Sequence, residues 1–332
     1  MRRRRFFTLG LGAAACVAAS AAGCGAEQAP GAGARPGGAA AGRFVVAPAG
    51  RRWGRMCGAF VRVARESGFQ VAEGTGGTGG TGGTAITFTG LPALAVAQLN
   101  GTRTPLETAT PLSRLAAEIE VVVVAAGSRF KDFDDLGARL RADPAATLLA
   151  GGPQGEPGHL LFGLIAKGLG ADTRKVDYTG YATGDEVVAA LLSGRAAAAA
   201  GSLADWRPAI AYGRVRPLAV STAGRVEGLD VPTLLECGVR VDFGDWCAAF
   251  GPQGMSRENR ETAVALFDAV ASSRRWEAAC RAGGWEPIPL SGDDLRRWLT
   301  SEAQRTYAVL GDLGLIDAAK NTTCWVGCGN GH

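Results

Sequence analysis

Histidine is scarce in this 332-residue chain: His159 lies near its middle and His332 is the last residue. One internal histidine leaves little for a Ser-His-acid constellation, and no GxSxG elbow is present. The chain also lacks a P-loop, which excludes nucleotide hydrolysis by that motif. We therefore expect no enzyme activity and interpret His159 as a hydrogen-bonded pocket or core residue. An exported hydrolase that uses His159 stays open as an alternative.

Clusters of lysine and arginine with interleaved aromatic residues are missing beyond the amino end, so composition argues against a nucleic-acid partner. The formal net charge is +4, but residues 1–23 hold four arginines and no acid, which accounts for all of it. The remaining chain is close to neutral. Its basic pI therefore indicates nothing about a polyanionic partner.

No apolar run at the amino end is long enough for a membrane span, since Phe6–Ala22 is short and rich in alanine. Four arginines precede this run, and together they predict a signal peptide over residues 1–23. The pattern RRRFFTL matches a twin-arginine signal, as any arginine-rich leader would, so the export route stays open. The run ends in AAGC, which resembles a bacterial lipobox with Cys24 as the acylated residue. An ordinary cleaved signal peptide is the alternative.

The next segment, residues 24–42, consists almost entirely of glycine, alanine and proline, which predicts a disordered tether between membrane and domain. An exported chain permits disulfides. Cys237 and Cys247 bracket a helix end and the next strand, a placement that could bring them together, but the pairing stays open. Besides Cys16 and Cys24, the chain has six cysteines, namely Cys57, Cys237, Cys247, Cys280, Cys324 and Cys328.

The carboxyl end, residues 321–332, is predicted to be a flexible tail. Cys324, Cys328 and His332 form C-x3-C-x3-H within it. Three potential ligands without a fourth favour a local disulfide or disorder over a zinc site. We expect neither a metal nor a cofactor in this protein.

Between these ends the chain is long enough, and apolar enough at 47%, for two lobes. Short apolar strands alternate with amphipathic helical patterns, which is typical of parallel sheets covered by helices on both faces. Ser291, with Asp294 three residues later, predicts a capping box for the last helix. The predicted strands are 44–47, 69–72, 85–89, 120–125, 147–150, 176–178, 196–200, 216–220 and 245–250. The predicted helices are 53–66, 91–98, 133–141, 158–169, 185–192, 203–212, 257–272, 274–282 and 292–310.

The stretch EGTGGTGGTGGTAITF, Glu73–Phe88, interrupts this pattern with three Gly-Gly-Thr units. A glycine-rich repeat is usually a linker, but its backbone N–H groups can also form a concavity that holds an anion. This repeat follows a strand and stays inside a lobe, where ligands of such sheets bind. We therefore favour the anion-binding interpretation, with a surface loop as the alternative.

Several stretches together resemble one family, the solute-binding receptors of tripartite tricarboxylate transporters (Bug-type periplasmic receptors), over residues 43–317. The most specific is VDYTGYATGDEVVAALLSGRAAAAAGSLADWRPAIAYGRVRPLAV, residues 176–220. It contains the tyrosine strand, the glycine-rich turn, the acid-headed helix and the Leu-Ala-Val strand of that family. LDVPTLLECGVRVDFGDWCAAFGPQGMS, TPLSRLAAEIEVVVVAAGSRFKDFDDL and the closing LGDLGL fit the same order.

The resemblance implies a two-lobed periplasmic-binding-protein-like (type II) α/β fold with a mostly parallel sheet in each lobe. Glu120–Ala125 and Asp245–Phe250 would be the two crossover strands. Lobe 1 would then comprise residues 43–125 and 248–320, and lobe 2 residues 126–247.

The resemblance also implies ligand loops after four strands, where neutral N–H and hydroxyl donors hold a carboxylate. This chain departs from the family at Arg51-Arg52-Trp53-Gly54-Arg55, which replaces a glycine-rich turn and a Trp-Asp pair. Arg51 or Arg55 could therefore pair with the ligand directly. The predicted ligand-binding residues are Ala49, Gly50, Arg51, Thr75, Gly76, Gly77, Thr78, Thr89, Gly152, Gln154, His159, Tyr178, Tyr181, Thr183, Gly184, Ser202 and Trp246.

The sequence thus predicts a membrane-tethered, exported receptor that captures a citrate-like acid or a dicarboxylate for the permease of a tripartite transporter. We expect it to be a monomer. An extracytoplasmic sensor that presents its ligand to a signalling partner would have the same sequence features, and this alternative stays open. The identity of the ligand is not encoded in any of these motifs.

Overall fold

The computed structural model describes residues 44–74 and 83–317. Predictions for residues 1–43, including the signal peptide, the tether and Cys24, lie outside this part of the chain. So do those for Thr75, Gly76, Gly77 and Thr78, and for the tail with Cys324, Cys328 and His332. No helix of the described ranges is long and apolar enough to cross a membrane.

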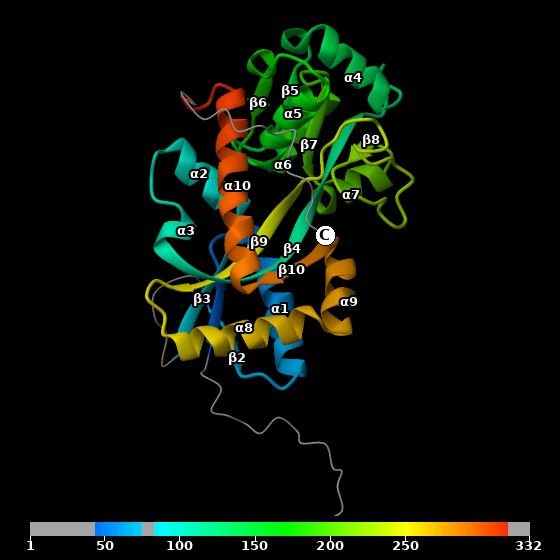
Figure 1. The fold of residues 1–332 in the computed structure, drawn as a ribbon. Coiled ribbons are helices and arrows are strands. Elements are labelled where there is room, and N and C mark those ends of the chain that lie inside the picture. Colours follow the sequence, from blue (N-terminus) through cyan, green and yellow to red (C-terminus); the bar gives the residue numbers. More distant parts are fainter. Residues whose placement is uncertain (1–43, 75–82, 318–332) are drawn as a thin grey trace, which may run out of the picture. The chain divides into compact units, whose positions relative to one another are not determined.

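The described chain is a mixed α/β structure in which helices flank a sheet of ten strands (Figure 1). The strands are β1 (Phe44–Pro48), β2 (Val71–Glu73), β3 (Thr84–Gly90), β4 (Ala109–Ala125), β5 (Leu149–Gly151), β6 (Tyr178–Gly180), β7 (Ala198–Ser202), β8 (Val215–Val220), β9 (Gly244–Pro252) and β10 (Trp285–Ser291). The α-helices are α1 (Gly54–Glu66), α2 (Leu91–Leu99), α3 (Pro105–Thr108), α4 (Phe133–Ala142), α5 (Pro157–Gly168), α6 (Gly184–Leu192), α7 (Leu203–Ala211), α8 (Arg257–Ala271), α9 (Arg274–Gly283) and α10 (Gly292–Asp312). Short 3-10 helices are η1 (Arg51–Trp53), η2 (Pro144–Ala146) and η3 (Thr173–Lys175).

Two groups of parallel strands are joined through the long strand β4 and its neighbour β9. The first strand group is β1–β3 and the second is β5–β7. The sheet order is β2-β1-β3-β9-β4-β7-β5-β6, and β8 and β10 also pair with β4. The pairs within β1–β3 and within β5–β7 are parallel, whereas every pair made by β4 or β9 is antiparallel. At 17 residues, β4 is long enough to pair with β9 and β10 in its first part and with β7 and β8 in its second. It therefore belongs to both strand groups.

An aromatic cluster packs α1, α8 and α9 together beside the first strand group. Phe60 of α1 stacks on Phe267 of α8 with ring centroids 4.6 Å apart, and Trp276 of α9 meets Phe60 edge-on at 5.9 Å. All three side chains are fully buried. Burial of each one stabilises the fold by roughly 1.5–3 kcal/mol.

The second strand group has an apolar cluster on each face of its sheet. Successive side chains of a strand point to opposite faces. Accordingly, Ala198 and Ala200 of β7 lie in the cluster that includes α5 and α10, while Ala199 lies in the cluster that includes α6 and α7. This two-sided burial explains why the sequence of β7 is almost entirely small and apolar.

Helix α10 packs against strands β4 and β10 and against helices α2 and α5, and is visible as the long orange helix in Figure 1. At its middle, the carbonyl of Ala303 accepts a hydrogen bond from Gln98 of α2 at 2.8 Å. At its end, Asp312 accepts one from Lys167 of α5 at 2.6 Å. The predicted boundaries of the two lobes remain a prediction, because the sheet itself is continuous through β4.

Most predicted helices and strands are confirmed to within about two residues, but three local predictions were wrong. Strand β10 was missed, because Pro287 and Pro289 mask its pattern, and β4 begins 11 residues before the predicted start at Glu120. The capping box at Ser291 is also absent: its hydroxyl donates to Asp268 of α8 at 3.0 Å instead. In each case a tertiary contact outweighs the local signal.

The possible pairing of Cys237 with Cys247 was also wrong. The four cysteines of the described ranges, Cys57, Cys237, Cys247 and Cys280, are all free. Burial raises the pKa of Cys57 to about 12 and that of Cys237 to about 11. These thiols stay protonated at neutral pH, which does not suit a nucleophile.

Candidate functional site

The loop from β1 to α1 directs a different arginine toward the crossover strands from those predicted. Ala49, Gly50 and Arg51 are exposed, and the N–H of Ala49 donates to the carbonyl of Phe88 at 2.8 Å. The next residue, Arg52, points toward the crossover strands. It bonds with two acids that come from distant parts of the chain.

Arg52 forms ion pairs with Asp245 of β9 and Glu156 at the start of α5. Its Nη1 donates to Asp245 Oδ2 at 2.7 Å, and its Nη2 donates to Glu156 Oε2 at 2.6 Å. The side chains of Arg52 and Glu156 are 35% and 26% exposed, whereas that of Asp245 is fully buried. Burial lowers the pKa of Arg52, but the neighbouring acids outweigh this effect, so the guanidinium stays charged. Arg52 therefore links the first strand group to the second.

Two further acids, Glu118 and Glu120, lie on the same crossover region in β4. Glu118 is satisfied: its Oε1 accepts from Trp285 Nε1 at 2.9 Å and its Oε2 accepts from Ser202 Oγ at 2.5 Å. Glu120 is 1% exposed, and neither of its carboxylate oxygens has a hydrogen-bond partner. Burial, and then the charge of Asp245, raises the pKa of Glu120 well above its ordinary range.

The pKa of Asp245 is raised as well. Burial raises its pKa to about 7, although the charge and hydrogen bond of Arg52 act in the opposite direction. Its second oxygen, Oδ1, is buried without a hydrogen-bond partner. We define Glu118, Glu120, Asp245 and Glu156, together with Arg52, as the acidic floor.

The glycine-rich loop from β5 to α5 packs tightly against Tyr178 of β6 and Ala200 of β7. Tyr178 Oη donates to the carbonyl of Gly152 at 2.6 Å, so this hydroxyl already has an acceptor. A Cβ on Gly151 would lie 2.5 Å from Tyr178 Oη, and one on Gly158 would lie 2.8 Å from the carbonyl of Ala200. The glycines are thus required for close packing of the loop.

His159 is packed under the same loop. Its Nδ1 accepts a hydrogen bond from the N–H of Gly155 at 3.1 Å, and its ring stacks on Tyr178 with centroids 4.1 Å apart. Burial lowers its pKa to about 4, so the ring is neutral at physiological pH. These contacts agree with the interpretation of His159 as a hydrogen-bonded, packed residue.

The remaining predicted residues are divided between loops and packed positions. Thr183 caps α6, since its hydroxyl accepts from the N–H of Glu186 at 3.3 Å, and the next residue, Gly184, has open space beside it. Ser202 donates to Glu118 and therefore lies on the acidic floor. Trp246 is buried edge-on against Trp298 of α10.

Three other predicted residues occupy different environments: Gln154 is exposed, Tyr181 is partly buried and Thr89 is buried. Their roles in ligand binding remain predictions.

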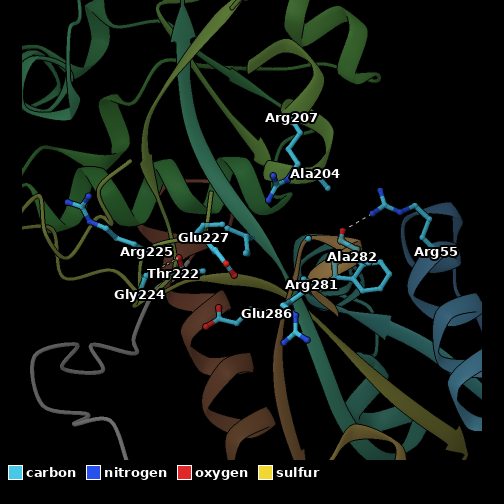
Figure 2. A pocket seen from close by; sticks show the side chains of 15 residues that line it. Arg55, Ala204, Arg207, Thr222, Gly224, Arg225, Glu227, Arg281, Ala282 and Glu286 are labelled. Carbon is cyan, nitrogen blue, oxygen red and sulfur yellow. Dashed lines mark hydrogen bonds between the residues drawn. The ribbon is translucent and has the colours of Figure 1, made fainter. Parts of the chain in front are cut away.

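A pocket of about 640 Å³ opens on the other side of β4, where β8 ends and β10 begins (Figure 2). It is lined on one side by α7 and the segment after β8, and on the other by α1, the end of α9 and β10. The two sides approach closely at Gly284, whose φ is 75° and whose Cβ position lies 3.8 Å from Ala204 Cβ. Its charged lining residues are Arg55, Arg207, Arg225, Arg281, Glu227 and Glu286.

Four arginines and two acids make this arginine pocket positive, in contrast to the acidic floor. Arg55 donates to the carbonyl of Gly283 at 2.8 Å, drawn as the dashed line in Figure 2, and lies over the ring of Trp285. Arg225 pairs with Glu236 at 2.9 Å. The side chain of Arg207 extends from α7 toward the centre of the view. Since Glu236 and Asp230 offset the charge of Arg225, the pocket keeps a small excess of positive charge from Arg55, Arg207 and Arg281 over its two acids.

Sequence reasoning missed Arg52, the four acids of the floor and the arginine pocket. A signal for the floor was present in EIEVVVV, where Glu118 and Glu120 alternate with apolar residues in a buried strand. Burial of an acidic side chain in such a strand costs free energy of folding unless the carboxylate has an ion-pair or hydrogen-bond partner. Arg52 could not be distinguished from Arg51 and Arg55, because only the path of the loop decides which arginine turns inward.

A family model described as "Tripartite tricarboxylate transporter family receptor" matches residues 86–315. Among curated proteins, the chain is 33% identical over 196 residues to the "UPF0065 protein in tcbD-tcbE intergenic region" of Pseudomonas sp. (strain P51). That match covers 55% of this chain and 57% of the relative, so it spans little more than half of the relative's length.

Solved structures show the same fold. A TctC solute-binding protein from Polaromonas, without ligand, has a TM-score of 0.66 at 17% identity and is matched over 81% of this chain and 98% of its own. The R. palustris protein Rpa4515, solved with adipate, has a TM-score of 0.65 at 22% identity, over 82% and 96% of the two chains. The predicted periplasmic-binding-protein-like class is thus confirmed at the level of the fold.

Proposed function

The chain belongs to the tripartite tricarboxylate transporter receptor family, and from this premise we propose that it captures a small carboxylate and delivers it to the permease of a tripartite transporter. The observation that carries the proposal is the family match over residues 86–315, which includes both crossover strands and the second strand group. The relative solved with adipate supports a small carboxylate as the ligand class. The positive arginine pocket supports attraction of an anion.

In this proposal the two lobes, residues 43–125 with 248–320 and residues 126–247, close around the ligand by bending at β4 and β9. The ion pair of Arg52 with Glu156 joins a loop of one lobe to a helix of the other. A ligand that binds better between closed lobes shifts the open–closed equilibrium toward the closed form.

The carboxylate is held by the loops at the strand ends. The helices α5 and α6 begin there, and their first N–H groups carry partial positive charge. Gly152, Gln154 and Gly184 belong to these loops. The predicted ligand residues Thr75, Gly76, Gly77 and Thr78 lie outside the described residues and stay part of the proposal.

The function is tested by thermal unfolding of the purified chain against mono-, di- and tricarboxylates. A ligand at about a hundred times its Kd adds roughly 2.7 kcal/mol to the free energy of unfolding. This gain corresponds to a rise in Tm of several degrees. If no carboxylate raises Tm or gives a calorimetric binding signal, the carboxylate receptor proposal is wrong.

We also propose that the protein is exported as a monomer and anchored by acylation of Cys24. A lipoprotein cysteine carries several acyl chains, enough for stable attachment to a membrane. Replacement of Cys24 by Ala should move the protein from the membrane fraction to the soluble fraction and abolish palmitate labelling. An unchanged distribution between fractions would contradict the anchor.

A further inference from the structure

The arginine pocket is a cavity of about 640 Å³ whose lining includes neither the acidic floor nor the glycine-rich loop before α5. Its residues come from two walls, α7 with the segment after β8 on one side and α1, α9 and β10 on the other (Figure 2). None of the predicted ligand-binding residues that the structure describes lines it. The pocket is therefore a candidate for a second binding site.

Two of the four pocket arginines already have partners in the protein. Arg55 is fixed by its hydrogen bond to the carbonyl of Gly283 and by its position over the ring of Trp285. Arg225 pairs with Glu236 at 2.9 Å. These two side chains shape the walls, and their contacts leave the other two arginines as the main source of free charge.

Arg207 and Arg281 differ from them, because neither forms a hydrogen bond or an ion pair within residues 44–74 and 83–317. Arg207 reaches from α7 to the opposite wall, where its Nε lies 4.0 Å from the Cβ position of Gly284. Arg281 belongs to α9, on that opposite wall. Both guanidiniums therefore keep their N–H donors available for an anion.

The segment after β8 adds backbone donors to the pocket. Gly224, Arg225 and Val226 line it, and their N–H groups have no acceptor among the described residues. The hydroxyl of Thr222 is already used, since it donates to the carbonyl of Gly224 at 2.8 Å. Successive backbone N–H groups can form a concavity that holds an anion.

The two acids of the pocket oppose an anion only weakly. Glu227 is exposed, so water and salt screen its charge. Glu286 is partly buried, and burial, followed by the charge of Asp242, raises its pKa. A raised pKa favours the neutral form of this carboxyl over the charged form.

The placement of the donors distinguishes between kinds of anion. A carboxylate is planar and presents its two oxygens along one edge, which suits a single guanidinium. A phosphate or sulfate group presents oxygens at the corners of a tetrahedron and can accept from several sides at once. Donors that come from opposite walls, as Arg207 and Arg281 do, match the tetrahedral group.

We propose that the arginine pocket is a second binding site, for a divalent tetrahedral oxyanion, held by Arg207 and Arg281 from opposite walls and by the N–H groups of residues 224–226. The bound anion joins α7 to the turn between α9 and β10, so it stabilises the close approach of the two walls. This inference does not depend on the proposed function, because the pocket contains none of the residues assigned to the carboxylate.

The test is calorimetric titration of the full chain with sulfate and with inorganic phosphate in sodium chloride, which screens binding to scattered surface charge. We expect saturable binding of at least one of the two anions. Hydrogen exchange should slow in residues 222–227 and 281–286 when that anion binds. No saturable binding of either anion up to about 10 mM would overturn the proposal.

Variants locate the site. Arg207→Gln and Arg281→Gln each remove a guanidinium from one wall and should weaken binding at least tenfold. Arg274→Gln, at an exposed position on the same helix as Arg281, is the matched control and should keep the affinity within about twofold. All three positions are exposed, so the variants should fold. Unchanged affinity in both pocket variants would overturn the assignment to this pocket.

Glycerol 3-phosphate distinguishes the two sources of such a group. Tighter binding than that of inorganic phosphate would support the proposal and assign the pocket to a phosphate monoester, such as a lipid headgroup. Weaker binding would support it and assign the pocket to the free anion.

Succinate tests the class of anion. It should displace the better-bound oxyanion from the pocket at least tenfold less effectively than the unlabelled oxyanion itself does. Equal displacement, lost in Arg207→Gln and Arg281→Gln, would overturn the preference for a tetrahedral group. If no carboxylate binds anywhere while sulfate or phosphate binds in the pocket, the receptor proposal is wrong and the oxyanion site stands.

Discussion

Two regions of opposite charge lie on either side of a single strand, β4. Glu118 and Glu120 belong to the acidic floor, whereas Ile119 between them lines the arginine pocket. Alternation of side chains along a strand accounts for this division. Trp285 connects the two regions, because its ring lines the pocket while its Nε1 donates to Glu118.

Burial, more than the number of charges, decides which of the two regions contributes more to the free energy of unfolding. Asp245 and Glu120 are removed from water, so each must be neutral or paired. The pocket arginines are exposed, and water and salt screen them. We therefore expect substitutions in the floor to change stability and selectivity, and those in the pocket to change mainly the rate of ligand capture.

The largest expected effect comes from removing the cation of the floor. Arg52→Gln leaves Asp245 buried without its partner, which should lower the free energy of unfolding at pH 8 by about 2–4 kcal/mol. This range is set below that of fully buried pairs because Arg52 is 35% exposed. Arg281→Gln in the pocket should cost less than about 0.5 kcal/mol. Urea unfolding measures both, and equal losses would remove the distinction between the regions.

The floor should also make stability depend on pH. In the native state the pKa of Asp245 is about 7, because burial, Glu118 and Glu156 raise it against the opposing effect of Arg52. The pKa of Glu120 is raised as well. In the unfolded chain an Asp carboxyl titrates near about 3.9. Between these values the native state binds more protons, so stability is full at low pH and falls as pH rises through about 7.

Between pH 5 and pH 8 this loss should be on the order of 2 kcal/mol for Asp245 alone. Asp245→Asn should flatten the decline, and Asp230→Asn, an exposed acid, should leave it unchanged. The measurement is the urea midpoint across that pH range. A wild-type curve that rises with pH would contradict the assignment of raised pKa values to the floor.

A smaller effect is expected where the two regions meet. Trp285→Phe removes the donor to Glu118 Oε1 and should cost about 1–2 kcal/mol beyond the loss of ring volume. Trp276→Phe is the matched control, because Trp276 is fully buried and its Nε1 has no hydrogen-bond partner. The difference between the two variants in chemical unfolding reports the hydrogen bond. A difference near zero would show that Glu118 finds another donor.

The smallest effect should come from the pocket. The double variant Arg207→Gln with Arg281→Gln reduces the positive field, so the association rate of an anionic solute should fall severalfold at low salt. The difference should vanish near about 0.5 M salt, where the Debye length is only a few ångströms. Stopped-flow fluorescence with the best-bound carboxylate measures this rate. A large loss of affinity at high salt would instead place the ligand itself in the pocket.

Local patterns predicted much of the fold, because each helix or strand buries an apolar face that is legible in the sequence. The helices 133–141 and 185–192 were predicted to within a residue of α4 and α6. Strand β10 was not predicted, since Pro287 and Pro289 interrupt its pattern and only its pairing with β4 makes it a strand. The loops of the candidate site could be predicted from their glycines, whose close packing the structure explains.

The sequence by itself determined the alternation of strands and helices, the family and the position of the glycine-rich loops, because these depend on local periodicity and short motifs. Only the tertiary structure decided that Arg52 turns inward, that it meets Asp245 across 193 positions of chain and Glu156 across 104, and that Glu120 is left without a partner. Charges so far apart in sequence interact only after β4, β9 and the loop before α1 are brought together. Their effect depends on burial, which no local pattern specifies.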